Sequence, residues 1–349
     1  LTFDLRASVD AFAAQIIRGP VDDPEKPAMA LVGFPAGSGG WSWSAYCRAV
    51  EGITKGRMPL LLPPEVIPKL APRLEFYNRK DLSNPAATWL PAGLAALGVH
   101  PANAVCYLSP DLCILLLSYG REVTAYDAAV LESFVTQSLF LRSLALQVSE
   151  TENAFAYTVA ALARAAEVHH EDTGAHIQRV GEYCAVLAER LGLPGSFVRS
   201  IRLQAQMHDV GKIHTHPDLL RKSGKLTPEE WVEVRKHTVY GARIIGDHPR
   251  LKMATSVALS HHEKWDGSGY PFGLRGEAIP IEGRISGLAD QYDALRSWRS
   301  YKPAMDHATT VRAFTHGWDR TSPDHFEPAL LEAFLTIHER FAEIYERTR

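Results

Sequence analysis

The sequence predicts an α+β N-terminal domain followed by an all-α helical bundle. The first observation is that short apolar runs typical of strands occur only within about the first 125 residues. The second is that the apolar residues recur almost wholly at helical spacing from residue 151 onward. A length of 349 residues is enough for two domains. We place the first domain at residues 1–145 and the second at 150–349, joined by a linker helix at about 125–165.

The composition is that of an ordinary globular protein, with 46% hydrophobic and 22% charged residues. A net charge of −3 gives no general argument for nucleic-acid binding, so we expect no DNA partner. The most apolar run, residues 112–117, is too short to cross a bilayer, so we expect no membrane segment. The four cysteines lack a CxxC spacing, which indicates reduced thiols and a cytoplasmic location.

The elements of the first domain follow from the order of its apolar runs. Residues 5–18 have a helical period that a Gly-Pro pair ends. Residues 28–34 form a short strand, and the glycine-rich loop behind it lacks a phosphate-binding motif. Prolines then predict a loop-rich middle. The segments 104–108 and 112–119 are predicted to be two paired strands.

A long helix follows this strand pair. Thr124 can cap its start, and apolar residues step by three and four from Ala128 to Leu139. The pattern runs on through Leu162 toward His169. Such a helix either pairs with its copy in a homodimer or packs on its own domain, and the pattern leaves both open.

In the second domain, histidines and aspartates gather on inward helix faces. An apolar helical stripe from Phe197 leads to His208 and Asp209, and a carboxylate beside an inward imidazole is costly to bury without a cation. Thr227 caps a further helix that carries His237 inward.

Three more groups continue this pattern at positions 172 and 176, 261 and 262, and 290 and 293. Imidazoles and carboxylates on successive helices suit a bundle that holds two or more metal ions. Because no thiolate takes part, iron, manganese or zinc in a hydrolytic role is favoured over a structural zinc site.

Motifs in this half resemble those of the HD-GYP phosphodiesterases, in the family's order, over about residues 165–305. They are Asp172-Thr-Gly-Ala-His176, His208-Asp209-Val-Gly-Lys212, His237-Thr-Val-Tyr-Gly241, His261-His262-Glu-Lys-Trp-Asp-Gly-Ser-Gly269-Tyr270-Pro271, Gly273-Leu-Arg-Gly-Glu-Ala-Ile-Pro280, Ala289-Asp290-Gln-Tyr-Asp293-Ala-Leu295 and Arg299-Ser-Tyr-Lys302. The resemblance implies an enzyme that hydrolyses the second messenger cyclic di-GMP to pGpG, GMP or both.

The resemblance also implies the metal ligands. They are His176, His208, Asp209, His237, His261, His262 and Asp290. Family members with three metals have Glu where this chain has Asp172, and Asp is one methylene shorter. We therefore predict two divalent ions, iron or manganese, with a third ion only if Asp172 reaches it.

Asp209 and Lys212 are the predicted catalytic residues, because Asp209 would anchor the ions and Lys212 would reach the phosphate or the leaving oxygen. Two divalent ions lower the pKa of a bound water and neutralise phosphoryl oxygens. Arg299 and Lys302 supply cations for the second phosphate of a cyclic dinucleotide. The predicted substrate-binding residues are Lys212, Gly269, Tyr270, Asp293, Arg299 and Lys302.

The layout of residues 1–145 resembles a GAF-type sensory domain, which implies that this region regulates the enzyme. A second hypothesis is a catalytically weak HD-GYP domain that binds cyclic di-GMP or a GGDEF-domain partner. The complete ligand set favours the enzyme, while Asp172 and the divergent segment 213–218 keep the alternative open. Other HD-type phosphohydrolases that act on nucleotides lack the His-His and Gly-Tyr-Pro segment.

Overall fold

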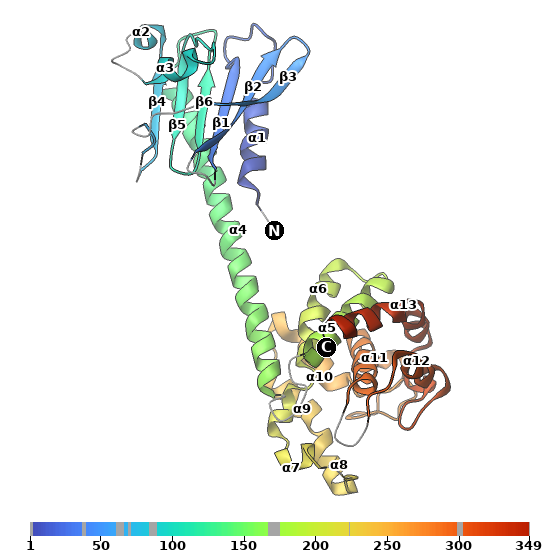
Figure 1. Cartoon of the computed structure of the whole chain (residues 1–349). Coiled ribbons are helices and arrows are strands. Elements are labelled where there is room, and N and C mark those ends of the chain that lie inside the picture. The colour runs from blue at the N-terminus through green and yellow to red at the C-terminus, as the bar shows by residue number, and fades with distance from the viewer. Residues whose placement is uncertain are drawn as a thin grey trace. The chain divides into compact units, whose positions relative to one another are not determined.

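The computed structural model describes residues 3–36, 40–60, 66–68, 71–83, 89–166, 175–222, 224–298 and 303–348. The chain divides into two compact units, Leu1–Thr151 and Glu152–Arg349, and each is described by itself. The first contains an antiparallel sheet and the second is built from helices, as Figure 1 shows. The predicted order, a sheet-containing region followed by a helical one, is confirmed.

The sheet of the first unit has six antiparallel strands in the order β3-β2-β1-β6-β5-β4 (Figure 1). The strands are β1 (Met29–Pro35), β2 (Trp41–Ala49), β3 (Gly52–Met58), β4 (Arg73–Tyr77), β5 (Ala104–Leu108) and β6 (Cys113–Leu117). The central strand β6 is buried along its whole length, and its side chains alternate between two cores. Ile114 and Leu116 face one core, and Leu115 and Leu117 face the other.

The predicted strand at 28–34 and the predicted pairing of 104–108 with 112–119 are confirmed by β1, β5 and β6. The strands β2, β3 and β4 were not predicted. Most residues of β3 are exposed, and β4 is a short strand at the sheet edge. Strand β3 lacks the apolar run and the clean alternation that identify a strand from sequence, and β4 has only five residues.

Helices α1 (Leu5–Ile16) and α4 (Ala125–Ala166) cover one face of the sheet, where Val9, Leu131 and Val135 are fully buried. The short helices α2 (Arg79–Leu82) and α3 (Leu90–Ala95) lie between β4 and β5 in the chain. The predicted cap of α4 is present, since the backbone N–H of Tyr126 donates to the Thr124 hydroxyl at 3.2 Å.

Helix α4 has 42 residues and extends from the first unit into the second. Its residues from 140 to 154 are exposed, apart from the half-buried Ala145. By length and composition alone, α4 could also cross a membrane: its most apolar window has a mean hydropathy of 1.2, and 17% of that window is buried. The expected absence of a membrane segment therefore stays a prediction.

The second unit is a bundle whose core is formed largely by α5, α11 and α13. The ring of Tyr183 on α5 lies 4.4 Å from Phe341 on α13 and 5.3 Å from Tyr292 on α11, between ring centroids. The helices are α5 (Ala175–Arg190), α6 (Gly195–Gln204), α7 (Pro217–Leu220), α8 (Pro228–Arg235), α9 (His237–Ile245), α10 (Lys252–Ser260), α11 (Ile281–Arg296), α12 (His307–His316) and α13 (Pro328–Arg347), with 3-10 turns η1 (Ala205–Met207), η2 (Val210–His214), η3 (Pro249–Leu251), η4 (Gly276–Ala278) and η5 (Pro323–His325).

The helix predicted to carry His208 ends earlier than expected. Helix α6 stops at Gln204, and the chain continues through η1 and η2, with His208 and Asp209 between them. This path includes a close backbone approach, since a Cβ on Gly211 would lie 1.8 Å from the carbonyl oxygen of His237. Only glycine fits there.

Candidate metal centre

The structure brings the predicted metal ligands of the second unit together. They come from α5, from the turn between η1 and η2, from the start of α9, from the end of α10 and from α11. These residues are His176, His208, Asp209, His237, His261, His262 and Asp290.

The predicted cap that starts α8 is also present, since Thr227 and Glu230 form a reciprocal capping box.

A first group consists of His176, His208 and Asp209, whose ligand atoms all lie within 4.8 Å of one another. Asp290 faces the same group, with Oδ1 at 3.7 Å from the Nε2 of His176 and at 3.7 Å from that of His208. A cation placed among these atoms would meet two imidazoles and two carboxylates.

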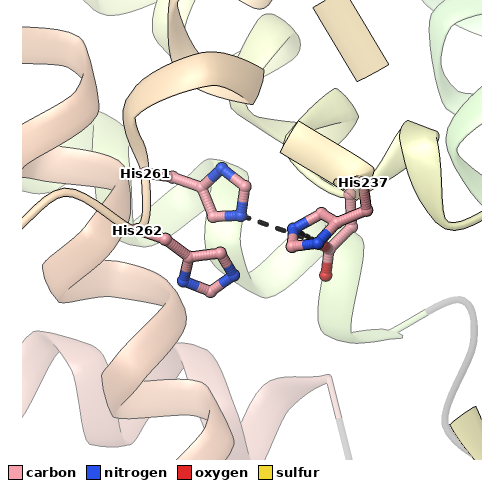
Figure 2. A group of neighbouring side chains, drawn as sticks. His237, His261 and His262 are labelled. Carbon is pink, nitrogen blue, oxygen red and sulfur yellow. Dashed lines mark ion pairs between the residues drawn. The ribbon is translucent and has the colours of Figure 1, made fainter. Parts of the chain in front are cut away.

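A second group consists of Asp209, His237, His261 and His262, again within 4.8 Å of one another. Figure 2 shows the three imidazoles gathered around one point. The Oδ1 of Asp209 lies 3.2 Å from the Nε2 of His237 and 3.7 Å from that of His261. Asp209 therefore belongs to both groups, as a carboxylate shared by two neighbouring ions would.

Backbone carbonyl groups orient three of the imidazoles. The Nδ1 of His208 lies 2.9 Å from the Ala205 oxygen, and the Nδ1 of His261 lies 3.0 Å from the Val257 oxygen. The Nδ1 of His237 likewise lies 2.7 Å from the oxygen of Val234, on α8. Since a carbonyl only accepts, each Nδ1 carries the proton, and each Nε2 presents its lone pair to the centre.

Residues 160–322 match the HD domain family. This part of the chain is an HD domain. An HD domain implies the binding of divalent metal ions, and the two ligand groups described above provide places for them.

Several curated relatives share this domain. A cyclic di-GMP phosphodiesterase of Vibrio cholerae serotype O1 is 40% identical over 219 residues, which cover 58% of this chain and 44% of that protein. A 3'3'-cGAMP-specific phosphodiesterase 2 of the same organism is 38% identical, over 66% and 44% of the two chains. A cyclic di-GMP phosphodiesterase of Thermotoga maritima is 37% identical, over 52% and 49%. The chain thus spans about half the length of these relatives. They confirm the predicted HD-GYP resemblance, whereas the GAF-like identity of residues 1–145 stays a prediction.

The electrostatics of the HD domain centre fit a cation. Burial opposes ionisation of Asp209, but Lys212 and the flanking imidazoles hold the pKa of its carboxyl well below the usual range. Burial, together with neighbouring imidazoles, lowers the pKa of His262 well below its usual value. Burial also lowers the pKa of His261. The centre therefore holds an ionised carboxylate near two imidazoles, those of His261 and His262, whose neutral form is favoured, and metal binding requires both of these states.

Buried polar atoms in the centre lack ordinary partners. Among the described residues, the Nε2 atoms of His237 and His261 and the Oδ1 of Asp209 have no hydrogen-bond partner. Burying such atoms is costly unless a further partner satisfies them. A divalent ion is such a partner, so the residues present fit the group that the HD domain implies.

Asp293 has a different place from the one predicted. It is fully buried, its Oδ2 lies 2.7 Å from the Nδ1 of His176, and both its oxygens accept hydrogen bonds from the Arg179 guanidinium. Burial alone would raise the pKa of Asp293, but these two partners lower it to about 2. Asp293 therefore has no exposed surface to offer a substrate in this structure, and it lies where an outer carboxylate that orients His176 would lie.

Lys212 and the Gly-Tyr-Pro segment border the centre. The Lys212 ammonium donates to the Oδ2 of Asp209. Tyr270 places its ring 4.7 Å from that of His262, between centroids. A Cβ on Gly269 would lie 2.4 Å from the backbone nitrogen of Lys264, so this loop runs directly along the chain that follows His262.

Sequence reasoning missed three residues around the centre. Glu263 is buried and accepts hydrogen bonds from the backbone N–H groups of Phe272 and Leu274, at 2.8 and 2.9 Å, which fixes the loop. Arg179 clamps Asp293, and its place one turn after His176 on an inward helix face was the available signal. The guanidinium of Arg235 lies 5.0 Å from the centroid of the Tyr270 ring. Three predicted site residues, Asp172, Arg299 and Lys302, lie outside the described residues.

Proposed function

We propose that the HD domain of this chain hydrolyses cyclic di-GMP to pGpG, GMP or both, with the aid of two divalent ions. The observation that carries the proposal is the position of Asp209 between two separate groups of imidazoles. The names of the relatives, which include cyclic di-GMP phosphodiesterases, support the substrate.

Each ligand group would hold one ion. His176, His208 and Asp290 would surround the first, and His237, His261 and His262 the second, with Asp209 between them. When bound, the ions supply the positive charge that activates a water and offsets the charge of the phosphodiester. Imidazole and carboxylate ligands suit iron, manganese or zinc, and of these we propose iron or manganese. A third ion would depend on Asp172.

The chain's own cations would position the substrate. Lys212 points its ammonium at Asp209 and so stands where a phosphoryl oxygen would approach the ions. Arg235 packs over the face of Tyr270, and this ring in turn packs against His262. We propose that Lys212 serves the reacting phosphate and that Arg235 and Tyr270 bind the rest of the cyclic dinucleotide. Arg299 and Lys302 remain predicted contacts to the second phosphate.

The test is product analysis with protein purified anaerobically and loaded with iron or manganese. We expect cyclic di-GMP to yield pGpG or GMP, and the Asp209→Asn variant to yield neither. Parallel incubation with 3'3'-cGAMP separates the two substrates named among the relatives. Tight binding of cyclic di-GMP without any product would refute the proposed hydrolysis. It would support the second hypothesis, a catalytically weak domain that binds cyclic di-GMP.

We propose further that residues 1–145 form a GAF-like domain that regulates the HD domain. The layout behind this resemblance is present as α1, the six-stranded sheet with β5 and β6 as its last strands, and the exit helix α4. The cytoplasmic location and a GGDEF-domain partner stay predictions.

Helix α4 supports a homodimer, which we also propose. Within the first unit, α4 carries five apolar side chains at successive steps of four, seven, three and four residues. This is the alternation of three and four in a coiled-coil heptad, except that polar Gln137 occupies the position between the second and third of them. Those apolar residues are Val130, Phe134, Leu141, Leu144 and Val148. All but the half-buried Phe134 are between 40% and 48% exposed, so a second copy of α4 could cover this stripe.

Light scattering of the full chain tests the dimer. We expect a mass of twice 38.6 kDa for the wild type and a monomer for Leu144→Glu, because a carboxylate would face its copy in the seam. Leu146→Glu is the matched control, since Leu146 is 60% exposed but lies off the stripe. A monomeric wild type, or equal dissociation by both variants, would refute the proposed seam.

A further inference from the structure

Away from the metal centre, the second unit holds another set of metal-type side chains where α12 meets α13. The Nε2 of His307, the first residue of α12, lies 2.9 Å from the Nδ1 of His338 on α13. The carboxylate of Glu339 adds an oxygen 3.6 Å from the His338 nitrogen and another 4.0 Å from the His307 nitrogen. We propose that His307, His338 and Glu339 bind one divalent ion of the zinc type, which joins α12 to α13.

The orientation of His307 supports the proposal. Its Nδ1 lies 2.8 Å from the hydroxyl of Tyr292, whose ring is fully buried and packs against Phe341 and Phe334 on α13. A metal-bound imidazole commonly donates its other N–H to such a fixed oxygen, which sets the ring's direction.

The donor set suits zinc. Two imidazoles and one carboxylate form a common three-ligand set for this ion, with the fourth position left to water. Two nitrogens bound to one tetrahedral zinc stand about 3.3 Å apart, given Zn–N bonds of about 2.0 Å. The observed 2.9 Å must therefore widen by a few tenths of an ångström, and the His338 side chain, 30% exposed, has room to turn.

The surrounding charge also suits a cation. The nearby Arg296 guanidinium is paired with the Glu346 carboxylate at 2.9 Å, while Glu339 is 76% exposed and brings a negative charge to the cluster. Without an ion, the two imidazoles share a single hydrogen bond.

This site is independent of the proposed function, because it would link helices and takes no part in hydrolysis. The test is zinc binding by the full chain, measured by equilibrium dialysis against buffered free zinc. We expect His338→Ala to lose one zinc equivalent per chain, or to need at least about tenfold more free zinc to retain it. Glu339→Gln, which keeps the shape of an exposed side chain, should weaken the same equivalent.

Two controls make the result specific. His316→Ala removes an exposed histidine at the other end of α12 and should leave the zinc content unchanged. His262→Ala should lower zinc binding at the HD centre while keeping the equivalent that His338→Ala loses. The site would be overturned if wild type, His338→Ala and Glu339→Gln bound the same amount of zinc at every free zinc concentration. It would also be overturned if His316→Ala lost as much zinc as His338→Ala. Either result leaves the phosphodiesterase proposal untouched.

Discussion

The Nδ1 of His176 lies 2.7 Å from the Oδ2 of Asp293, a side chain that has no exposed surface. Asp293 is held in turn by two hydrogen bonds from Arg179, at 2.6 and 2.9 Å. This chain of contacts fixes the imidazole so that its Nε2 faces Asp290 and the first ligand group. The three side chains thus act as a unit behind the metal centre.

Replacing Asp293 with Asn should weaken metal binding without removing a ligand. The loss of an outer carboxylate behind a ligating His typically costs 10- to 100-fold in affinity, and we expect about that much, measured by competition with a chelator. The change also leaves Arg179 charged and buried, which costs about 3–5 kcal/mol of stability.

A double variant separates these two effects. Arg179→Met together with Asp293→Asn removes the unpaired buried charge, so stability should recover while metal affinity stays low. Asp247→Asn, at an exposed aspartate, is the control and should change neither quantity. Full metal affinity in the double variant would show that Asp293 does not orient His176.

Asp209 and Lys212 should separate metal binding from hydrolysis. Asp209→Asn keeps the shape but removes the negative charge between the two groups, so metal content and turnover should fall together. Lys212→Ala should retain both ions and slow hydrolysis about 100-fold or more, as expected for loss of a group that stabilises charge in the transition state. Metal analysis beside product chromatography checks both, and loss of metal in Lys212→Ala would contradict its role on the phosphate.

Much of the centre could be predicted because metal ligands are identified by residue type and local spacing. His208 and Asp209 are adjacent in sequence, and His261 and His262 are also adjacent, so their chemistry is visible before the fold is known. The role of Asp293 could not be predicted. Its partner Arg179 is 114 residues away, and only burial distinguishes an orienting carboxylate from one that contacts substrate.

The sheet shows the same limit. The continuous apolar run of β6 identifies a buried strand, whereas β3 is exposed along most of its length and is held by pairing with β2. That pairing is a tertiary contact, which a single strand's sequence does not encode. Likewise, α6 ends at Gln204, and the close approach of Gly211 to α9 farther along the chain is a tertiary contact that no local pattern reveals.

Arg235 should contribute to substrate affinity. Its guanidinium lies over Tyr270 beside the centre, where a phosphate or a guanine edge can meet it. We expect Arg235→Gln to raise KM for cyclic di-GMP about tenfold with metal content unchanged. Arg243→Gln, on α9, is the control, since that guanidinium lies against Tyr240 instead. An unchanged KM would mean that Arg235 only supports the Tyr270 ring.

The first unit should lose stability in acid through Asp127. Arg121 donates to both of its oxygens, at 2.7 and 2.9 Å, and this pair lowers the pKa of Asp127. Because the folded-state pKa lies below the unfolded value, the pair stabilises the fold above about pH 4, and the contribution is lost as pH falls through the folded pKa.

Calorimetry at pH 7 and in acid can measure this contribution. Asp127→Asn should lower the stability of the first unit by about 1–2 kcal/mol at pH 7 and by less in acid, with the second unit's transition unmoved. Asp22→Asn, at an exposed position, is the control. If Asp127→Asn lowered the stability of the first unit equally at both pH values, the ionised pair of Arg121 and Asp127 would not be the cause of the loss.

Gly269 offers the sharpest test of the loop beside the centre. A Cβ there would lie 2.4 Å from the backbone nitrogen of Lys264 and 2.5 Å from the Cα of Glu263, so Gly269→Ala must displace backbone. The displacement would move Tyr270 off His262 and strain the hydrogen bonds that Glu263 accepts from the loop.

We expect Gly269→Ala to keep its metals, since no ligand is removed, and to lose about 100-fold in kcat/KM through misplacement of the substrate. Gly195→Ala is the matched control, because the nearest atom to its Cβ would be the end of the Arg199 side chain at 3.5 Å. Wild-type kcat/KM in Gly269→Ala would mean that the loop does not contact the dinucleotide. Loss of metal would mean instead that the loop holds His262 in place.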